Sequence, residues 1–189
     1  NWPALLYPAA AIAAAALLQS RFWLRLRVPA LVLGGVMTAG VYLQATAAPL
    51  PLARGQDPTL ARLGGWEDFV AAVEVAAARE GAAFVAAEEY GLASVLAFRM
   101  PRGRMVVAMD PRWRHFALPP PTPGVTGMLV RSERRGEGPP LWPGAQPIGG
   151  EAGRLLRSRR GITAEAYRLH RVTTAPGQPP SAMLPRPVR

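Results

Sequence analysis

The chain has 189 residues, no cysteine and 21 prolines, and its 22 basic against 12 acidic residues give a net charge of +10. Without cysteine, a disulfide framework and a thiolate metal site are both excluded. Every basic residue is arginine, which is typical of a GC-rich coding sequence that also favours Ala, Pro and Gly. We assign most of the charge to that composition and the remainder to anionic partners such as lipid phosphates.

Two apolar spans open the chain, residues 2–18 and 28–52, and neither contains an acidic or basic residue. A helix crosses a bilayer's hydrocarbon core with about 20 mostly apolar residues. Between the spans, residues 21–27 combine three arginines with Phe22 and Trp23, and arginine is favoured in cytoplasmic loops. The sequence therefore predicts two transmembrane helices within residues 1–52, joined on the cytoplasmic side, so that everything after residue 52 is extracytoplasmic.

The first span is preceded by neither an initiator methionine nor a basic segment, whereas a secretory signal peptide would show both. We therefore expect this chain to be the C-terminal part of a larger protein. Residues 53–64 are short and polar enough to be a linker to the next domain.

An alternation of helices and strands follows the linker. Residues 66–80 predict an amphipathic helix, because apolar side chains recur on one helical face at Trp66, Phe69, Val70, Val73 and Ala77. Residues 82–87 and 105–109 are continuous apolar runs of strand length, which is typical of strands buried on both faces. Residues 90–100 predict a second helix, which Pro101 ends.

This order predicts a small α/β domain with a mostly parallel sheet and right-handed crossovers, with its core in residues 65–131 and a third strand at 124–131. Residues 132–161 are rich in Arg, Gly and Pro and are expected to be a mobile loop with a solvated basic surface, in which 151–160 forms one short basic helix. A last strand is expected within 162–174, at 166–172 on the sheet edge. Residues 175–189 are expected to be a disordered tail.

One group of residues is placed to bind a ligand. Ligands of open α/β sheets bind outside the carboxyl ends of the strands. The two predicted strands are followed by acids, aromatic rings and arginine, namely Glu88, Glu89, Tyr90, Asp110, Arg112, Trp113 and His115. These side chains could hold a sugar or a phosphate. Alternatively, Glu88 and Glu89 only begin the next helix, where acids favour the helix dipole, and Trp113 and Phe116 only anchor the domain against the membrane or another part of the protein.

No catalytic motif accompanies this group. The sequence lacks a phosphate-binding glycine loop, a nucleophile elbow and an acidic calcium loop. The histidines, His115 and His170, are far apart, so we expect no metal site. We predict no catalytic residue and no cofactor in this chain, and no nucleic-acid partner, because no nucleic-acid-binding motif is present.

Three segments resemble a known family: residues 1–8 (NWPALLYP), the run from Gly65 and Trp66 to Phe69, and the run from Val85 through Tyr90 to Phe98. They are similar to late parts of bacterial dolichyl-phosphate-mannose-protein mannosyltransferase-like enzymes, a family that includes protein O-mannosyltransferases and the aminoarabinose transferases of lipid A. The resemblance covers roughly residues 1–116.

The resemblance implies an inverting glycosyltransferase, metal-assisted or metal-independent, of the bacterial inner membrane. It would move a sugar from a polyprenyl-phosphate carrier to a protein or lipid at the periplasmic face. The family's acidic base lies in an early loop with no counterpart here, so no catalytic residue is carried over and this part alone should be inactive. It would pack against the missing N-terminal transmembrane region and cap the active site.

Two other functions stay open at this point. One is a non-enzymatic, membrane-anchored binding or assembly module. The other is an arginine-rich DNA-binding protein, which would require everything from Arg54 onwards to be cytoplasmic.

Overall fold

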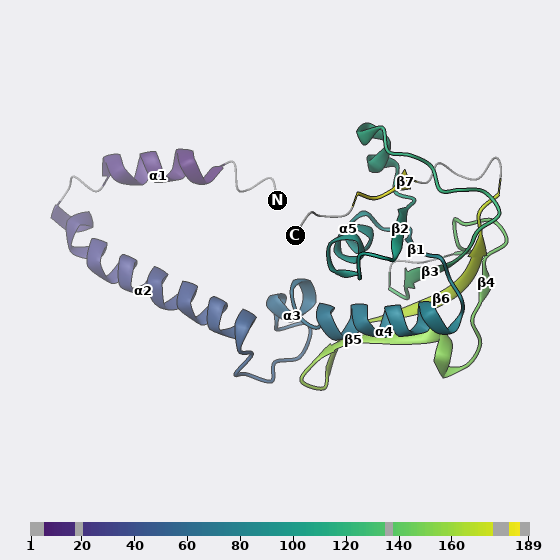
Figure 1. The fold of residues 1–189 in the computed structure, drawn as a ribbon. Helices are drawn as coiled ribbons and strands as arrows, with labels where there is room; N and C mark the ends of the chain where they lie inside the picture. The colour runs from purple at the N-terminus through teal and green to yellow at the C-terminus, as the bar shows by residue number, and fades with distance from the viewer. Residues whose placement is uncertain (1–5, 18–20, 135–137, 176–181, 186–189) are drawn as a thin grey trace. The chain divides into compact units, whose positions relative to one another are not determined.

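The computed structural model describes residues 6–17, 21–134, 138–175 and 182–185. The chain forms two compact units, Asn1–Leu50 and Pro51–Arg189. Figure 1 shows the two N-terminal helices of the first unit and the α/β arrangement of the second.

The first unit contains α1 (Leu6–Leu17) and α2 (Arg21–Thr46). Among the described residues, only the stretch Leu24–Thr46 of α2 is long and apolar enough to cross a membrane. The 12 residues of α1 rise about 18 Å, which is short of the roughly 30 Å of hydrocarbon. The structure thus supports one membrane-spanning helix where two were predicted. Residues 2–5 and 18 of the first predicted span lie outside the described ranges.

The expected loop at residues 21–27 is helical and forms the first two turns of α2. Its Arg and Leu residues favour helix, and it lacks the Gly, Pro, Asn and Asp that favour turns. At the other end α2 stops at Thr46 rather than continuing to residue 52. Ala48 has a left-handed φ of 43°, and Gln44 closes the helix end by hydrogen bonds in both directions with the backbone of Leu50, at 2.9 and 3.2 Å.

The second unit is built on a mixed sheet, which has seven strands within the described ranges. The strands are β1 (Phe84–Ala87), β2 (Met105–Ala108), β3 (Thr126–Ser132), β4 (Gln146–Pro147), β5 (Arg154–Arg159), β6 (Ile162–Thr173) and β7 (Ala182–Met183). Their order is β4-β6-β3-β1-β2-β7, and β5 also pairs with β6. The helical elements are α3 (Pro58–Arg62), α4 (Trp66–Arg79), α5 (Tyr90–Arg99) and the 3-10 turns η2 (Pro111–Phe116) and η3 (Glu151–Gly153).

The prediction of a mostly parallel sheet is wrong. Among the strands that the structure describes, β1–β2 and β1–β3 pair in parallel, whereas β2–β7, β3–β6, β4–β6 and β5–β6 are antiparallel. Parallel neighbours need a long crossover, usually a helix. Helix α5 supplies one between β1 and β2, but β5 and β6 are joined by a two-residue turn at Arg160 and Gly161, both with positive φ. Such a turn makes an antiparallel hairpin.

The central strands are buried on both faces, as their apolar runs predicted. On one face Val85 and Ala87 pack with apolar side chains of α4 and α5, including Val73 and Leu96. On the other face Phe84 lies in a smaller cluster. That face is covered by the 138–145 segment, whose Trp142 is 2% exposed and stacks on Phe84 at 5.6 Å between ring centroids. This segment falls within the region that was expected to be a mobile loop.

The helix predicted over 66–80 is confirmed as α4, with Phe69, Val70, Val73 and Ala77 buried. The strands at 84–87, 105–108 and 126–132 and the helix at 90–99 are likewise confirmed. The short basic helix expected at 151–160 is wrong, because this segment is η3 followed by β5. The last predicted strand is present as β6, but it lies between β3 on one side and β4 and β5 on the other, not on the sheet edge.

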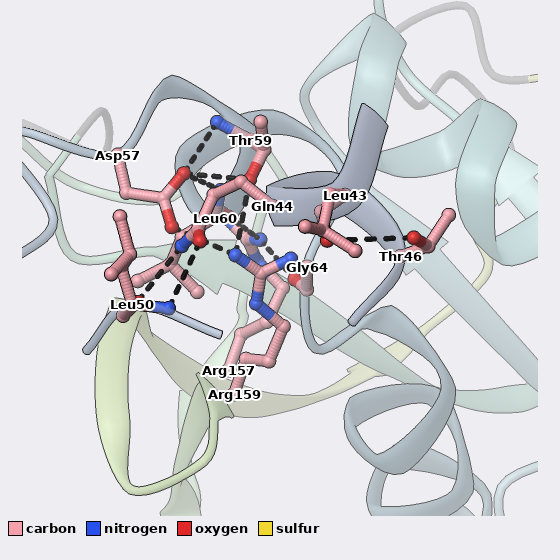
Figure 2. Close-up of polar contacts among 10 residues, drawn as sticks. All are labelled: Leu43, Gln44, Thr46, Leu50, Asp57, Thr59, Leu60, Gly64, Arg157 and Arg159. Atoms are coloured by element: carbon pink, nitrogen blue, oxygen red, sulfur yellow. Dashed lines mark hydrogen bonds and ion pairs between the residues drawn. The ribbon is translucent and has the colours of Figure 1, made fainter. Parts of the chain in front are cut away.

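The segment expected to be a linker contains α3, which two arginines of β5 hold in place (Figure 2). Asp57 caps the start of α3 by accepting hydrogen bonds from the backbone N–H groups of Thr59 and Leu60, and it pairs with Arg159 at 2.8 Å. At the other end, the Arg157 guanidinium donates to the carbonyl oxygens of Leu60, Ala61 and Gly64 at 2.6–3.1 Å. Both ends of α3 are therefore tied to β5.

The expected tail contributes to the sheet where the structure describes it. β7 pairs with β2, and the Leu184 N–H donates to the carbonyl of Val106. The flanking residues 176–181 and 186–189, also predicted to be disordered, lie outside the described ranges.

Candidate binding site at the carboxyl ends of the parallel strands

The carboxyl ends of β1, β2 and β3 lie side by side. Ala87 pairs with Ala108 of β2 and with Val130 of β3. The residues that follow β1 and β2 therefore meet at one edge, as the sequence predicted. We call this edge the rim and define it by Glu88, Tyr90, Asp110, Arg112 and Trp113.

Aromatic rings and a guanidinium form one half of the rim. The Tyr90 ring, at the start of α5, stacks on the Trp113 ring of η2, with 4.5 Å between centroids and 21° between planes. The Arg112 guanidinium carbon lies 4.4 Å from the Tyr90 ring centroid. Phe116, which is exposed, lies 5.5 Å from Trp113. The result is a partly exposed group of flat rings with a cation against one of them.

Asp110 fixes this group in position. Its carboxylate accepts hydrogen bonds from Arg112 Nε and Nη2, each at 2.8 Å, and from the Arg112 backbone N–H at 2.9 Å. The side-chain hydrogen bond from Arg112 is the largest cause that lowers the pKa of Asp110 to about 2, and hydrogen bonds from the backbones of Arg112 and Tyr90 add to it against the effect of burial. A carboxylate with so low a pKa is a poor proton acceptor at neutral pH. Asp110 therefore orients Arg112 rather than acting as a base.

Glu88 takes part in a different contact from the rest of the rim. It pairs with Arg131 of β3 at 3.0 Å, with both side chains about 10% exposed, and its other oxygen accepts from the Leu141 N–H at 2.7 Å. Arg131 in turn donates to the carbonyls of Gly138 and Pro139. This pair holds the 138–141 segment against the sheet, so the role of Glu88 in these contacts is structural.

The two remaining predicted site residues sit beside this group. Glu89 is the extended residue before α5, half-buried, and its side chain does not cap the helix. His115 is exposed in η2. The structure thus brings together Tyr90, Asp110, Arg112 and Trp113, and it turns Glu88 toward Arg131.

The sequence prediction of the site did not include Arg131. The residue ends the predicted third strand, so the same rule on carboxyl ends would have placed it at this edge. It also missed His170 of β6, opposite Leu129 of β3. Burial, and then the positive charge of Arg131, lower the pKa of His170, which favours the neutral imidazole.

The rim suits binding more than proton transfer, because both of its central carboxylates are engaged by arginines. In the described ranges, no three His, Asp or Glu side chains lie close enough together to hold a metal ion. No protein-family model, no curated protein and no solved structure matches this chain.

Proposed function

We propose that this chain is the C-terminal part of an inner-membrane glycosyltransferase that moves a sugar from a polyprenyl-phosphate carrier to a protein or lipid acceptor. Helix α2 anchors it among the helices of the N-terminal region. The second unit lies on the periplasmic side and covers the active site, whose catalytic groups come from elsewhere in the protein.

The observation that carries the proposal is the stack of Arg112, Tyr90 and Trp113 at the carboxyl ends of β1 and β2. A guanidinium has five N–H donors in a fork that matches phosphate oxygens, and the contact with Asp110 uses two of them. Flat aromatic faces offer an apolar surface to a sugar ring. A phosphate-linked sugar has both phosphate oxygens for the guanidinium and a ring face for the aromatic side chains. Ligands of α/β sheets bind at this edge.

The membrane part of the proposal is supported by α2, with its 23-residue apolar stretch. A polyprenyl-phosphate carrier keeps its lipid tail in the bilayer, so its sugar can be reached only by a protein held at the membrane. The resemblance of residues 1–8 and 65–98 to mannosyltransferase-like enzymes supports the same assignment.

The first test is to determine the coding sequence that precedes Asn1. The proposal expects several further apolar spans, with an acidic loop between the first two. A start codon close to Asn1 with nothing membrane-like before it would overturn the proposal. Topology mapping adds a second test, because a cysteine at position 103, exposed in the turn before β2, should react with a membrane-impermeant reagent added from the periplasmic side.

The alternative is a membrane-anchored binding or assembly module without catalysis. It is favoured by the second unit's own apolar core and by the pairing of both rim carboxylates with arginines. This alternative expects the chain to bind a sugar or peptide by itself and expects no linked transferase region. Cytoplasmic labelling at position 103 would instead favour the DNA-binding interpretation.

A further inference from the structure

Residues 138–145 cover one face of the sheet, and we call them the strap. Trp142 of the strap is buried and stacks on Phe84 of β1. Its indole N–H donates to the carbonyl of Thr173, the last residue of β6. The strap consists of Gly, Pro and apolar residues and contains no residue that titrates. Any effect of pH on its position must therefore come from side chains outside it.

The start of the strap is held by the ion pair between Glu88 and Arg131. Glu88 accepts a hydrogen bond from the Leu141 N–H, and Arg131 donates to the carbonyls of Gly138 and Pro139. We call these contacts the latch. Both charged side chains of the latch are about 10% exposed, and water and salt screen such a pair much less than an exposed one. A further charge placed beside the latch would therefore act strongly on it.

His170 of β6 lies on the same face of the sheet as the strap. It is opposite Leu129 of β3, and Leu129 packs in the cluster that contains Trp142. Arg131 is two residues beyond Leu129 on β3, and alternate residues of a strand share a face. On its other side His170 pairs with Pro147 of β4, the strand that follows the strap in the sequence. The imidazole therefore stands beside the latch, between β3 and β4.

The surroundings of this imidazole oppose a positive charge on it. Burial is the largest cause that lowers the pKa of the imidazole, and the charge of Arg131 is the next. Glu88 acts in the opposite direction, and Arg168 of β6 lowers the pKa further. Arg168 in turn shares Glu133 with Arg154 of β5. The residues of β4 and of the strap add no titratable group.

Protonation would also create a buried donor that lacks an acceptor. His170 Nδ1 is buried and has no hydrogen-bond partner in the described part of the chain. In a neutral imidazole this nitrogen can remain an acceptor, whereas both ring nitrogens carry a hydrogen in the cation. An unpaired buried N–H and a second cation beside Arg131 both raise the free energy of the closed strap.

We propose that the strap is a pH-sensitive closure, which lies on the sheet while His170 is neutral and opens when His170 takes up a proton. In the open strap, where water reaches the imidazole, its pKa returns toward the ordinary value of 6.5. The closed strap therefore keeps its full stability above pH 6.5 and loses it as the pH falls further, by at most about tenfold in the ratio of open to closed strap per pH unit. Opening would release the Glu88 carboxylate, two residues before Tyr90 of the rim, from its contact with Leu141. The inference concerns the second unit alone and does not require sugar transfer.

Hydrogen exchange of the Leu141 amide measures the open fraction, because this N–H bonds to Glu88 in the closed strap. The whole chain in detergent micelles is compared between about pH 7 and about pH 5.5. Exchange is expressed as a protection factor, which corrects for the intrinsic effect of pH on the exchange rate. We expect the Leu141 protection factor to fall severalfold over this range. The Met100 amide, which donates to the carbonyl of Leu96 in α5, should keep its protection, since only the strap opens.

The two histidines of the chain provide matched variants. His170→Gln keeps a polar side chain that cannot take up a proton, so the Leu141 protection factor should be constant over the same range. His115→Gln changes the exposed histidine of η2 and should leave the fall unchanged. In the wild type, an NMR titration of the His170 imidazole should follow the same pH course as the loss of protection. A constant protection factor in the wild type, an equal fall in His170→Gln, or titration of His170 without loss of protection would overturn the proposal.

Discussion

The guanidinium carbon of Arg157 lies 4.2 Å from the ring centroid of Trp66. The same guanidinium caps α3 and contacts Glu165 of β6 at 3.5 Å. One buried side chain thus joins the segment that enters the second unit, the first residue of α4 and the β5–β6 hairpin. The orientation of α3 relative to the sheet depends on this contact.

Replacing Arg157 with Met should destabilise the second unit by about 3–5 kcal/mol, because the buried carbonyls at the end of α3 lose their donor and Glu165 loses one of its partners. The free energy of unfolding would be measured by denaturant titration of the whole chain, followed by circular dichroism. Arg154→Gln is the control, because Arg154 is 47% exposed and exposed pairs contribute about 0–1 kcal/mol. Equal effects of the two substitutions would contradict the role given to Arg157.

Two substitutions at Asp57 should separate its two roles. Asn keeps the helix cap but loses the charge that pairs with Arg159, whereas Ala loses both. Asp57→Ala should therefore lower the free energy of unfolding by about 1 kcal/mol more than Asp57→Asn does, because about 1 kcal/mol is the usual contribution of a helix cap. In an Arg159→Gln background the cost of Asp57→Asn should fall, since the ion pair is already absent. If Asp57→Asn lowered the free energy of unfolding equally in that background, the ion pair with Arg159 would not be the interaction that the substitution removes.

Gly127 of β3 lies directly against the ring of Phe84, and a β-carbon at this position would overlap the ring. Gly127→Ala should destabilise the fold by about 1–3 kcal/mol through overpacking. Gly103→Ala, where a β-carbon meets open space, should have little effect. Thermal unfolding of both variants tests this, and the cost of Gly127→Ala should shrink when Phe84 is also changed to Leu. If Gly127→Ala destabilised the fold equally in the Phe84→Leu background, the ring of Phe84 would not be the group that a β-carbon at position 127 overlaps.

Acid should weaken the rim through Asp110. Its pKa falls from 3.8 to about 2 in the folded chain, so the Arg112 contact stabilises the fold fully above pH 4 and is lost as the pH falls toward 2. The stability difference between the wild type and Asp110→Asn should therefore be constant near neutral pH and vanish over that interval. Denaturant midpoints measured across the interval test this, and a difference that grows on acidification would be inconsistent with the assigned contact.

The sequence predicted those elements whose cause is local. The apolar spacing from Phe69 to Ala77 defines α4, and the continuous apolar runs define β1 and β2. It did not predict β5, because the burial of Arg157 depends on carbonyls of α3 almost 100 residues away. The pair Arg160 and Gly161 was a local indication of a hairpin, but the surrounding Arg and Leu residues favoured a helix.

In the candidate site, too, the features with a local cause were predicted and those that depend on distant contacts were not. Its place at the carboxyl ends of adjacent strands followed from the order of elements, and Tyr90, Asp110, Arg112 and Trp113 do meet there. The role of Glu88 depends on Arg131 and on the 138–141 segment, which only tertiary packing brings together. A sequence pattern predicts which residues lie at this edge of the sheet, but it does not predict which partner each side chain contacts.

The most direct test of the proposed function is sugar transfer by membranes that contain the product of the whole coding region. Polyprenyl phosphate carrying radiolabelled mannose or aminoarabinose would be supplied, and label in protein and lipid fractions would be counted. We expect transfer above that of membranes without the gene, with a raised KM for the carrier when Trp113 is replaced by Leu. No transfer from either carrier, with the protein correctly inserted, would contradict the assignment to polyprenyl-phosphate sugar transfer.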